Sequence, residues 1–560
     1  MIISFSVKST SDLIFFKHIV NIGMASLDEK IDSSNILSLY LSHDASATYI
    51  DKKDNIKVLE YERFVKQRYG AFTTALSYRD GLGTTDDQRR DFLQYIKDNV
   101  KGKIKLILIN SVIADDISFI LEYFPDVDIT LVSHHDAHAA SGFYTSNFKE
   151  ATVLSFDGGG NDANSDVCYT RSYSCKDNST ERVQNYPYSL GIPYGHLAKC
   201  IKEIKAGPDC EDHSLVYSGK IMGLCGYGNI KDEWLEPVSR FYKNCQISSN
   251  GLDVLGEEIG LTLKLNSIEG QDAYDLAATS QYIFENLAGK IIEELLKSGS
   301  SFNIILVGGC ALNVLFNQKL AEELKRIGGS LFVPPYPNDC GLSLGQFLLY
   351  TKHKEQLSPY MGFDILDRDK FDDYKKEYKA TKCSVSQLVD HIKGGKIIGV
   401  LQGESEIGPR ALGNRSIICD PSIKDMKDIL NSKVKFREWY RPFAPVCRLE
   451  DSNTYFDDVF ESDFMSYAPT VKKNYRDVLP SITHIDGTAR LQTVSKGGHK
   501  LFYNILTELK KRDEIPVILN TSFNIKGAPI LTTIEDALYV LDNTEMDFVY
   551  IEGFIFKKKS

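Results

Sequence analysis

The sequence predicts an α/β protein of two or three domains. Its 560 residues are too many to form one hydrophobic core. Apolar runs typical of strands alternate with helical patterns between residues 35 and 350, which indicates α/β architecture. Two units of the form strand, glycine turn, helix, at 151–160 and 304–326, can each bring backbone N–H groups to an anion. Together they predict a nucleotide cleft between two related α/β lobes.

The strands and helices of the first half follow from local patterns. Apolar runs at 36–41 and 47–50, separated by a short polar turn, predict a hairpin, and 57–63 continues this meander. A helix over 86–100 precedes a buried-type strand at 104–109. The later elements expected are a helix that carries His134 and His138, strands at 151–156, 304–307 and 331–333, and helices at 272–297 and 314–326.

A domain boundary is expected between residues 352 and 375, where the chain is charged and rich in turns. The predicted parts are an N-terminal extension at 1–34, a domain at 35–360 and a domain at 375–560. The last part has its own strand patterns at 396–401 and 516–519.

Composition excludes several classes of protein. The formal net charge of -11 argues against a non-specific nucleic-acid binder, which needs a basic face. The 11 cysteines include no Cys-x-x-Cys pair, which fits reduced thiols in the cytoplasm. No apolar run is long enough to cross a bilayer, and no secretory cleavage pattern follows the first residues. We therefore expect a cytoplasmic protein with neither a membrane nor a nucleic-acid partner.

Two histidines and two aspartates are candidate metal ligands. His134 and His138 are four residues apart and share one face of a helix. Asp157 ends a strand, and Asp339 is held between a proline-rich turn and Gly341. Imidazole with carboxylate suits Fe(II), Zn or Mn and leaves a position for substrate. The alternatives are helix histidines satisfied by solvent or backbone carbonyls, and a helix N-cap role for Asp339.

Basic residues of the second half predict an anion site. Four of them are predicted to lie in turns: Arg410, Arg441 and Arg490, which have glycine or proline nearby in the chain, and Lys435. In an acidic protein such turns imply phosphate ligands, because the guanidinium fork matches phosphate oxygens. Surface charge is the alternative, and it suits Lys433 and Arg437 better than Arg410. The strand at 516–519 ends in Asn520 and Ser522, which can hydrogen-bond a nucleotide or simply turn the chain.

Nine motifs, in this order, resemble those of the O-carbamoyltransferases of natural-product and nodulation-factor biosynthesis. The resemblance runs from about residue 37 to the end, and the string around Gly408-Pro409-Arg410 is its most specific part. The motifs are His43-Asp44-Ala45-Ser46-Ala47, His134-x-x-x-His138, Phe156-Asp157-Gly158-Gly159-Gly160, Gly219-Lys220-Ile221-Met222-Gly223-Leu224 with Gly226-Tyr227-Gly228, Gly308-Gly309-x-x-x-Asn313, Asp339-Cys340-Gly341, Ser405-x-x-Gly408-Pro409-Arg410-Ala411-Leu412-Gly413-Asn414-Arg415-Ser416, Arg441-Pro442-Phe443-Ala444-Pro445 and Asn520-Thr521-Ser522-Phe523-Asn524.

This resemblance implies a fold and a two-step reaction. The N-terminal part resembles the two-lobed actin/Hsp70-like fold of the tRNA threonylcarbamoyl transferases. The C-terminal part resembles the smaller α+β, YrdC-like domain that makes threonylcarbamoyl-adenylate. By resemblance, the second domain converts carbamoyl phosphate and ATP, with Mg, to carbamoyl-adenylate and pyrophosphate. The first domain, holding Fe(II) or a similar ion, passes the carbamoyl group to a hydroxyl of a small-molecule acceptor. Two separate chambers are expected, and a homodimer is left open.

The resemblance also assigns roles to residues. Lys435, Arg490 and Ser522 are expected to catalyse adenylate formation, and either His43 or Asp44 is the candidate base for transfer. Arg68 stands where a lysine that contacts the adenylate is expected, so charge is retained but the ammonium geometry is not. The expected ligands of the metal are His134, His138, Asp157 and Asp339. The expected nucleotide contacts are Arg68, Gly158, Gly159, Gly308, Gly309, Asn313, Arg410, Arg441 and Asn520.

Three other functions compete with this interpretation. A tRNA-modifying threonylcarbamoyl transferase is disfavoured by the fusion of both domains, the acidic charge and the string at 219–223. A metal-free actin-like ATPase or sugar kinase would leave the two histidines and the whole C-terminal half without a role. A catalytically dead binding protein does not explain why so many site residues are intact.

Overall fold

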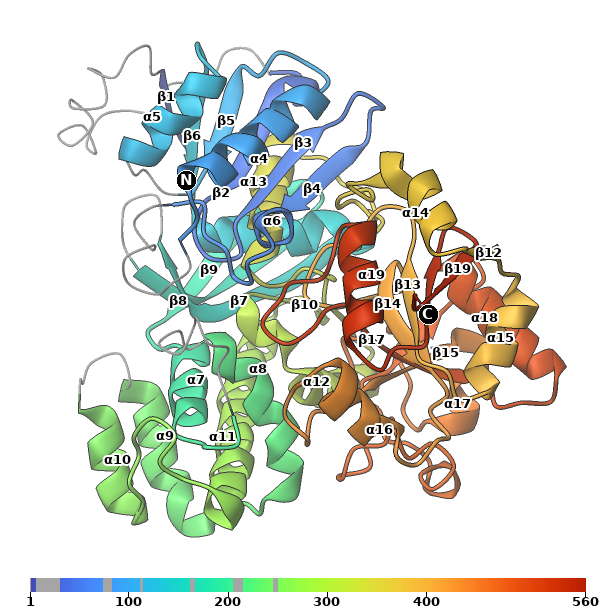
Figure 1. Cartoon of the computed structure of the whole chain (residues 1–560). Coiled ribbons are helices and arrows are strands. Elements are labelled where there is room, and N and C mark those ends of the chain that lie inside the picture. The colour runs from blue at the N-terminus through green and yellow to red at the C-terminus, as the bar shows by residue number, and fades with distance from the viewer. Residues whose placement is uncertain are drawn as a thin grey trace.

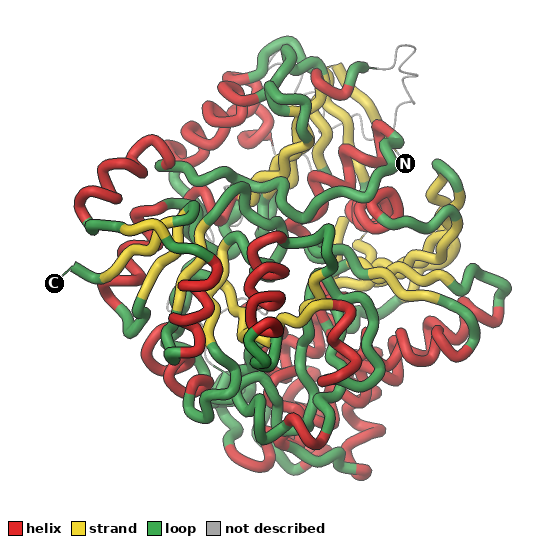
Figure 2. Tube along the Cα trace, turned by 90° about the vertical axis from the view of Figure 1, so that its right-hand side faces the viewer, coloured by secondary structure: helices red, strands yellow, loops and turns green. Residues whose placement is uncertain are grey.

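The computed structural model describes residues 2–6, 31–73, 83–110, 114–161, 167–204, 215–244 and 250–559. Within these residues the strands form three sheets of six, five and eight strands, all with helices packed beside them. Figure 2, in which strands are yellow, shows the three sheets as separate bodies. The predicted α/β class is therefore confirmed.

The first sheet contains the predicted hairpin. β2, β3 and β4 form an antiparallel meander, and β5 and β6 extend it in parallel beside β2. β1, which belongs to the predicted N-terminal extension, pairs antiparallel with β6. Across the sheet the strands are β1 (Ile2–Ser6), β6 (Asp128–Val132), β5 (Leu106–Ile109), β2 (Ile36–Tyr40), β3 (Ser46–Ile50) and β4 (Ile56–Glu60).

The predicted strand at 57–63 is wrong over its last three residues. β4 ends at Glu60, and α2 (Tyr61–Val65) follows directly. Arg63 is buried on this helical turn, where its guanidinium donates to the carbonyl of Glu406 at 2.5 Å and to that of Gly408 at 2.7 Å. Glu406 and Gly408 are far from Arg63 in the chain, so no local sequence pattern could have predicted this helical turn.

The second sheet repeats the topology of the first. β7, β8 and β9 form an antiparallel meander, and β10 and β11 extend it in parallel beside β7. Apart from β1, the two sheets have the same strand order and directions, as two related lobes require. Across the sheet the strands are β11 (Ser330–Phe332), β10 (Asn303–Val307), β7 (Glu150–Asn161), β8 (Val167–Lys176) and β9 (Ser179–Tyr186).

The first of the two predicted strand–turn–helix units is wrong. β7 does not stop at Asp157 but continues to Asn161 and pairs again with β8, with a break in register between Phe156 and Gly160. Asp157 therefore lies in a β-bulge, a feature that re-aims a side chain within a strand. The second unit is as predicted, because β10 leads through Gly308 and Gly309 into α12 (Val314–Arg326).

Helices fill the space around the two sheets (Figure 1). α6 (His134–Thr145) and α13 (Leu342–Thr351) pack against each other between the sheets, α6 against β7 and β10 and α13 against β2, β3 and β5. The predicted helices at 86–100 and 272–297 are confirmed as α4 (Asp86–Asn99) and α11 (Gly270–Lys297). The other α-helices that the structure describes in this half are α5 (Ala114–Tyr123), α7 (Gly191–Lys199), α8 (Leu215–Leu224), α9 (Leu235–Asn244) and α10 (Gly251–Ile259).

The third sheet lies wholly after the predicted boundary. It confirms the strands expected near 398 and 518, and its core is separate from the cores of the first two sheets. Its strands in order are β12 (Thr381–Lys382), β19 (Phe554–Lys557), β18 (Phe548–Ile551), β13 (Ile398–Leu401), β14 (Arg415–Cys419), β17 (Val517–Ser522), β15 (Ala444–Arg448) and β16 (Gln492–Val494). Its helices are α14 (Phe371–Glu377), α15 (Val385–Lys393), α16 (Met426–Ile429), α17 (Leu449–Tyr455), α18 (Lys500–Lys511) and α19 (Ile534–Asn543).

Among the described residues, no helix combines the length and the apolar character that a bilayer crossing requires.

Candidate functional site

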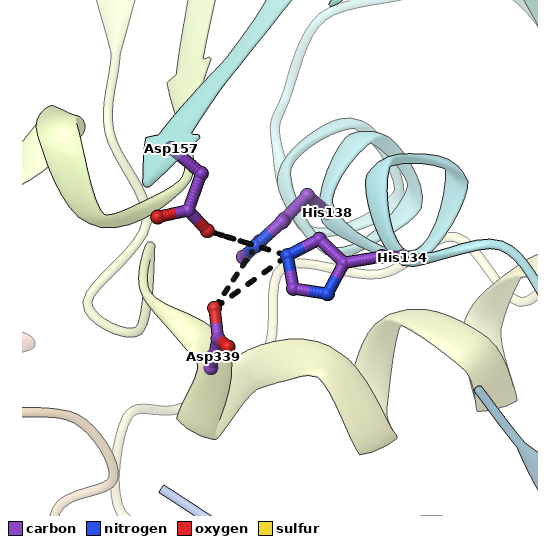
Figure 3. Close-up of side chains that lie close together, drawn as sticks. All are labelled: His134, His138, Asp157 and Asp339. Atoms are coloured by element: carbon purple, nitrogen blue, oxygen red, sulfur yellow. Dashed lines mark hydrogen bonds and ion pairs between the residues drawn. The ribbon is translucent and has the colours of Figure 1, made fainter. Parts of the chain in front are cut away.

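The four predicted metal ligands converge on one point (Figure 3). His134 and His138 project from one face of α6, Asp157 from the bulge of β7, and Asp339 from the turn before α13. The Nε2 atom of His138 lies 3.2 Å from Oδ2 of Asp157 and 3.3 Å from Oδ1 of Asp339. The Nε2 atom of His134 lies 3.3 Å from the same oxygen of Asp157 and 3.7 Å from that of Asp339.

These distances fit a bound divalent ion. Nitrogen and oxygen ligands about 2.1 Å from a tetrahedral ion lie about 3.4 Å from one another. The four His–Asp distances scatter around that value, and one donor atom from each residue lies within 4.8 Å of every other. All four side chains are buried. The cluster can therefore hold a metal ion with two nitrogen and two oxygen ligands.

The electrostatics of the cluster also favour a cation. Burial alone would raise the pKa of Asp157, but hydrogen bonds from His134 and His138 outweigh it and hold that pKa well below its usual value. Burial alone would lower the pKa of His138, but hydrogen bonds to Asp157 and Asp339 raise it to about 9. The carboxylates thus hold positive charge between them, as imidazole protons or as a metal ion that binds the neutral imidazoles.

Neighbouring side chains that sequence reasoning missed fix these ligands. The hydroxyl of Tyr40 donates to Oδ2 of Asp339 at 2.5 Å. His135 anchors α6 to the second sheet, since its two ring nitrogens lie 2.7 Å from Oγ of Ser155 and 2.8 Å from the carbonyl oxygen of Cys168. Burial lowers the pKa of His135 to about 3, so this ring is neutral. Only the position of Tyr40, at the end of a strand before the His-Asp turn, could have signalled its role.

The two candidate bases lie beside the cluster. Nε2 of His43 is 3.6 Å from Oδ2 of Asp339, and Nδ1 of His43 is 3.1 Å from Oδ2 of Asp44. Asp44 has a φ of 56°, a left-handed conformation that aspartate tolerates better than most residues. This turn brings Asp44 to the wall of the cavity next to the cluster.

One cavity of about 400 Å³ connects the His/Asp cluster with the basic residues of the second half. The wall includes Asp157 from the cluster, and the two predicted chambers are therefore joined, which corrects the expectation of separate ones. We call six basic side chains of this wall the cationic cluster: Arg68, Arg410, Lys435, Arg437, Arg441 and Arg490.

The cationic cluster has more positive charge than its neighbours neutralise. Within the described ranges, Arg410, Arg437 and Arg490 form no ion pair with an acidic side chain. Burial and repulsion by Arg410 hold the pKa of Arg490 well below its usual value. Burial and repulsion by Arg437 do the same to the pKa of Lys435. Such a site stabilises a ligand with several negative charges.

Two family models decide what the chain is. The model of the carbamoyltransferase N-terminus matches residues 73–348, and that of the carbamoyltransferase C-terminus matches residues 389–558. The chain belongs to the carbamoyltransferase family. It is 32% identical over 466 residues to nodulation protein NolNO of Sinorhizobium fredii, an alignment that covers 78% of this chain and 66% of that protein. It is 31% identical to nodulation protein NolO of Bradyrhizobium diazoefficiens, with 76% and 79% covered. Among solved structures, full-length HypF in its phosphate- and nucleotide-bound form aligns with 57% of this chain and 55% of its own, at 14% identity and a TM-score of 0.33.

One arginine of this carbamoyltransferase lines the cavity although the sequence did not single it out as a site residue. Arg437, for which surface charge was a plausible alternative, lies in the cavity wall. Its Nε donates to Oδ1 of Asn431 at 2.7 Å, and its guanidinium lies 4.5 Å from the centroid of the Phe443 ring. Lys433 does pair with a surface acid, Glu545, at 3.0 Å. The sequence neighbours of Arg437, Phe436 and Glu438, give no sign that it lines the cavity.

Lys435 and Ser522, two residues that the resemblance assigns to adenylate formation, are in contact. Nζ of Lys435 donates to the carbonyl oxygen of Ser522 at 2.6 Å, to its Oγ at 3.2 Å and to the carbonyl oxygen of Asn524 at 2.7 Å. With a fourth contact, to Oδ1 of Asn524, these bonds fix the ammonium group at the end of β17, on the cavity wall.

Three predicted nucleotide contacts do not reach the cavity of the carbamoyltransferase: Gly159, Gly308 and Asn520. Nδ2 of Asn520 donates to the carbonyl oxygen of Ala411 at 2.9 Å. Because Ala411 follows Arg410 in the chain, Asn520 supports the segment that carries Arg410 without lining the cavity itself. Gly308 has a φ of 90°, and a Cβ there would lie 2.3 Å from the backbone oxygen of Phe156, so it permits close packing. The predicted contacts Gly158, Gly309 and Asn313 do lie in the wall.

Proposed function

We propose that this carbamoyltransferase makes carbamoyl-adenylate from carbamoyl phosphate and ATP and delivers the carbamoyl group to a hydroxyl of a small molecule. One observation carries the proposal: a single cavity joins the cationic cluster to the His/Asp cluster. An adenylate can place its phosphate among the cations and its carbamoyl group toward the histidines. We also propose an actin/Hsp70-like fold for residues 35–360, which the repeated sheet topology supports, and a YrdC-like fold for residues 375–560.

The first step needs water to balance. Carbamoyl-adenylate keeps one phosphate of ATP, and pyrophosphate takes the other two. The phosphate of carbamoyl phosphate must therefore leave as orthophosphate, with one water consumed and carbamate formed. An oxygen of carbamate then bonds to the α-phosphorus of ATP as the bond to pyrophosphate breaks. Lys435, Arg410 and Arg490 would stabilise the charge on the transferring phosphoryl group, with Mg²⁺ accompanying ATP.

The second step transfers the carbamoyl group. The acceptor oxygen bonds to the carbamoyl carbon, the bond from that carbon to the AMP oxygen breaks, and AMP leaves. The hydroxyl proton passes to His43, oriented by Asp44, or to Asp44 itself. His134, His138, Asp157 and Asp339 would hold a divalent ion such as Fe(II), which when bound polarises a carbonyl oxygen as a Lewis acid.

The test is pyrophosphate release in the absence of any acceptor. Purified enzyme with Mg²⁺ should release pyrophosphate and orthophosphate in equal amounts only when both ATP and carbamoyl phosphate are present. Pyrophosphate release that needs no carbamoyl phosphate would indicate hydrolysis of ATP to AMP and pyrophosphate, and it would remove the proposal. Mass spectrometry of a hydroxyl-acceptor library would then identify the substrate.

Replacing Arg437 by glutamine should weaken substrate binding in the first step. Loss of one charged hydrogen-bond donor costs about 1.5–3 kcal/mol, so we expect the KM for ATP to rise about tenfold or more. Lys433→Gln is the control, because Lys433 is exposed and paired with Glu545 outside the cavity. Equal effects of the two changes on KM would show that the position of Arg437 in the wall has no bearing on binding.

A further inference from the structure

The motif at 219–228 has no role in the chemistry above, yet it contacts the C-terminal domain at several points. It spans the end of α8 and the short turn Cys225–Tyr227. Nε2 of His484 lies 3.0 Å from the carbonyl oxygen of Gly223. A Cβ at Gly226 would lie 2.7 Å from the His484 ring, so glycine is needed for this approach. The Tyr227 ring packs edge-on against Trp439, with ring centroids 5.1 Å apart.

Within this contact, one lysine of the first domain reaches the cationic cluster through an acid. Nζ of Lys220 donates to Oε1 of Glu438 at 2.9 Å, and both side chains are buried. The other carboxylate oxygen, Oε2, lies 3.4 Å from Nη1 of Arg441. Glu438 thus bridges a cation of the first domain and a cation of the phosphate-binding wall.

The charges on this bridge are set by its surroundings. Burial would raise the pKa of Glu438, but Arg441 and Lys220 outweigh it and lower that pKa to about 2. Burial lowers the pKa of Lys220 to about 8; Glu438 opposes this effect, and the nearby Arg441 and Arg68 add to it. At neutral pH the pair is therefore ionised, and above about pH 8 the lysine loses its charge.

We propose that Lys220 is a positioning residue that, through Glu438, holds Arg441 toward the phosphate of the substrate. Residues 436–443 form neither helix nor strand, so side-chain contacts must fix where Arg441 points. Because Lys220 comes from the first domain, docking of that domain completes the anion site of the second. This inference rests on the proposed function, since it takes the ligand of Arg441 to be a substrate phosphate.

The experiment measures acceptor-free pyrophosphate release by the full-length enzyme between about pH 7 and about pH 9.5, a range that spans the titration of a perturbed lysine. The variants are Lys220→Met, Lys220→Arg, Glu438→Gln and the double variant Lys220→Met/Glu438→Gln. Lys427→Met is the matched control: its Nζ lies 3.5 Å from the Tyr227 hydroxyl in the same contact, but outside the cavity wall.

We expect Lys220→Met to raise the KM for carbamoyl phosphate or ATP about tenfold, because a charge-assisted hydrogen bond is lost. The wild-type KM should rise above about pH 8, whereas Lys220→Arg should keep a low KM there, since guanidinium stays charged. The double variant should be no worse than the poorer single variant, because both changes break one interaction. Lys427→Met should match the wild type.

Distinct outcomes overturn the inference and the function it rests on. A wild-type KM in Lys220→Met, or additive effects in the double variant, would overturn the positioning role while pyrophosphate release persists. If Lys220→Met does not fold, the wild type is compared with Lys220→Arg instead. The same rise in KM at alkaline pH in both proteins would overturn the positioning role of Lys220. A wild-type enzyme that releases no pyrophosphate with both substrates would instead overturn the proposed function.

Discussion

Replacement of Lys435 by alanine should reduce carbamoyl-adenylate formation about a thousandfold, the size of effect seen when a cation that stabilises a transferring phosphoryl group is removed. The ammonium group is buried at the cationic end of the cavity and is held by four oxygen acceptors of Ser522 and Asn524. It is therefore already positioned before a substrate arrives. Pyrophosphate release dependent on carbamoyl phosphate is the measurement.

Two controls separate this effect from general damage. Metal content should stay at the wild-type level, because Lys435 is not part of the His/Asp cluster. Lys433→Ala, two residues away and paired with Glu545, should leave pyrophosphate release unchanged. Retention of more than about a tenth of the activity in Lys435→Ala would contradict a direct role in phosphoryl transfer.

The elements with a strong local pattern were predictable from the sequence. α12 begins and ends where its periodicity indicates, and the side chain of Asn313 caps it by accepting from the N–H of Phe316 at 3.1 Å. The hairpin of β2 and β3 follows from two apolar runs and a polar turn. That His134 and His138 share one helix face was predictable from their four-residue spacing.

What the sequence could not predict depends on contacts between distant residues. The break in register that aims Asp157 inward is set by pairing with β8, not by the glycines alone. Arg437 is held in the cavity wall by its contacts with Asn431 and Phe443. Its local sequence would look the same if its side chain pointed into solvent, so the sequence alone could not place it. The pairing of β1 with β6 joins residues more than 120 positions apart, as the match of Ser4 with Thr130 illustrates. The junction of the two expected chambers is likewise a product of domain docking.

Replacement of His138 by alanine should stop carbamoyl transfer and spare adenylate formation. His138 contacts both aspartates of the cluster and is fully buried, so its removal takes away one of the four candidate ligands and leaves two carboxylates facing each other. We expect the amount of bound metal, measured by elemental analysis, to fall at least about a hundredfold, and the rate of carbamoyl transfer to fall by a similar factor. Changing a residue that only supports a metal ligand already costs about 10- to 100-fold, and loss of a ligand itself should cost at least as much. Chelation of the wild type should give the same pattern.

A variant of the neighbouring His135 distinguishes the loss of a metal ligand from damage to the helix. His135 lies on the same helix and is as deeply buried, but its ring nitrogens face Ser155 and Cys168 and not the aspartates. His135→Ala should lower the temperature of unfolding and still retain metal. If His135→Ala lost metal as completely as His138→Ala, the metal loss in both variants would be explained by distortion of α6. If His138→Ala reduced pyrophosphate release as strongly as transfer, the division of the two steps between the ends of the cavity would be wrong, because the cationic cluster contains no residue of α6.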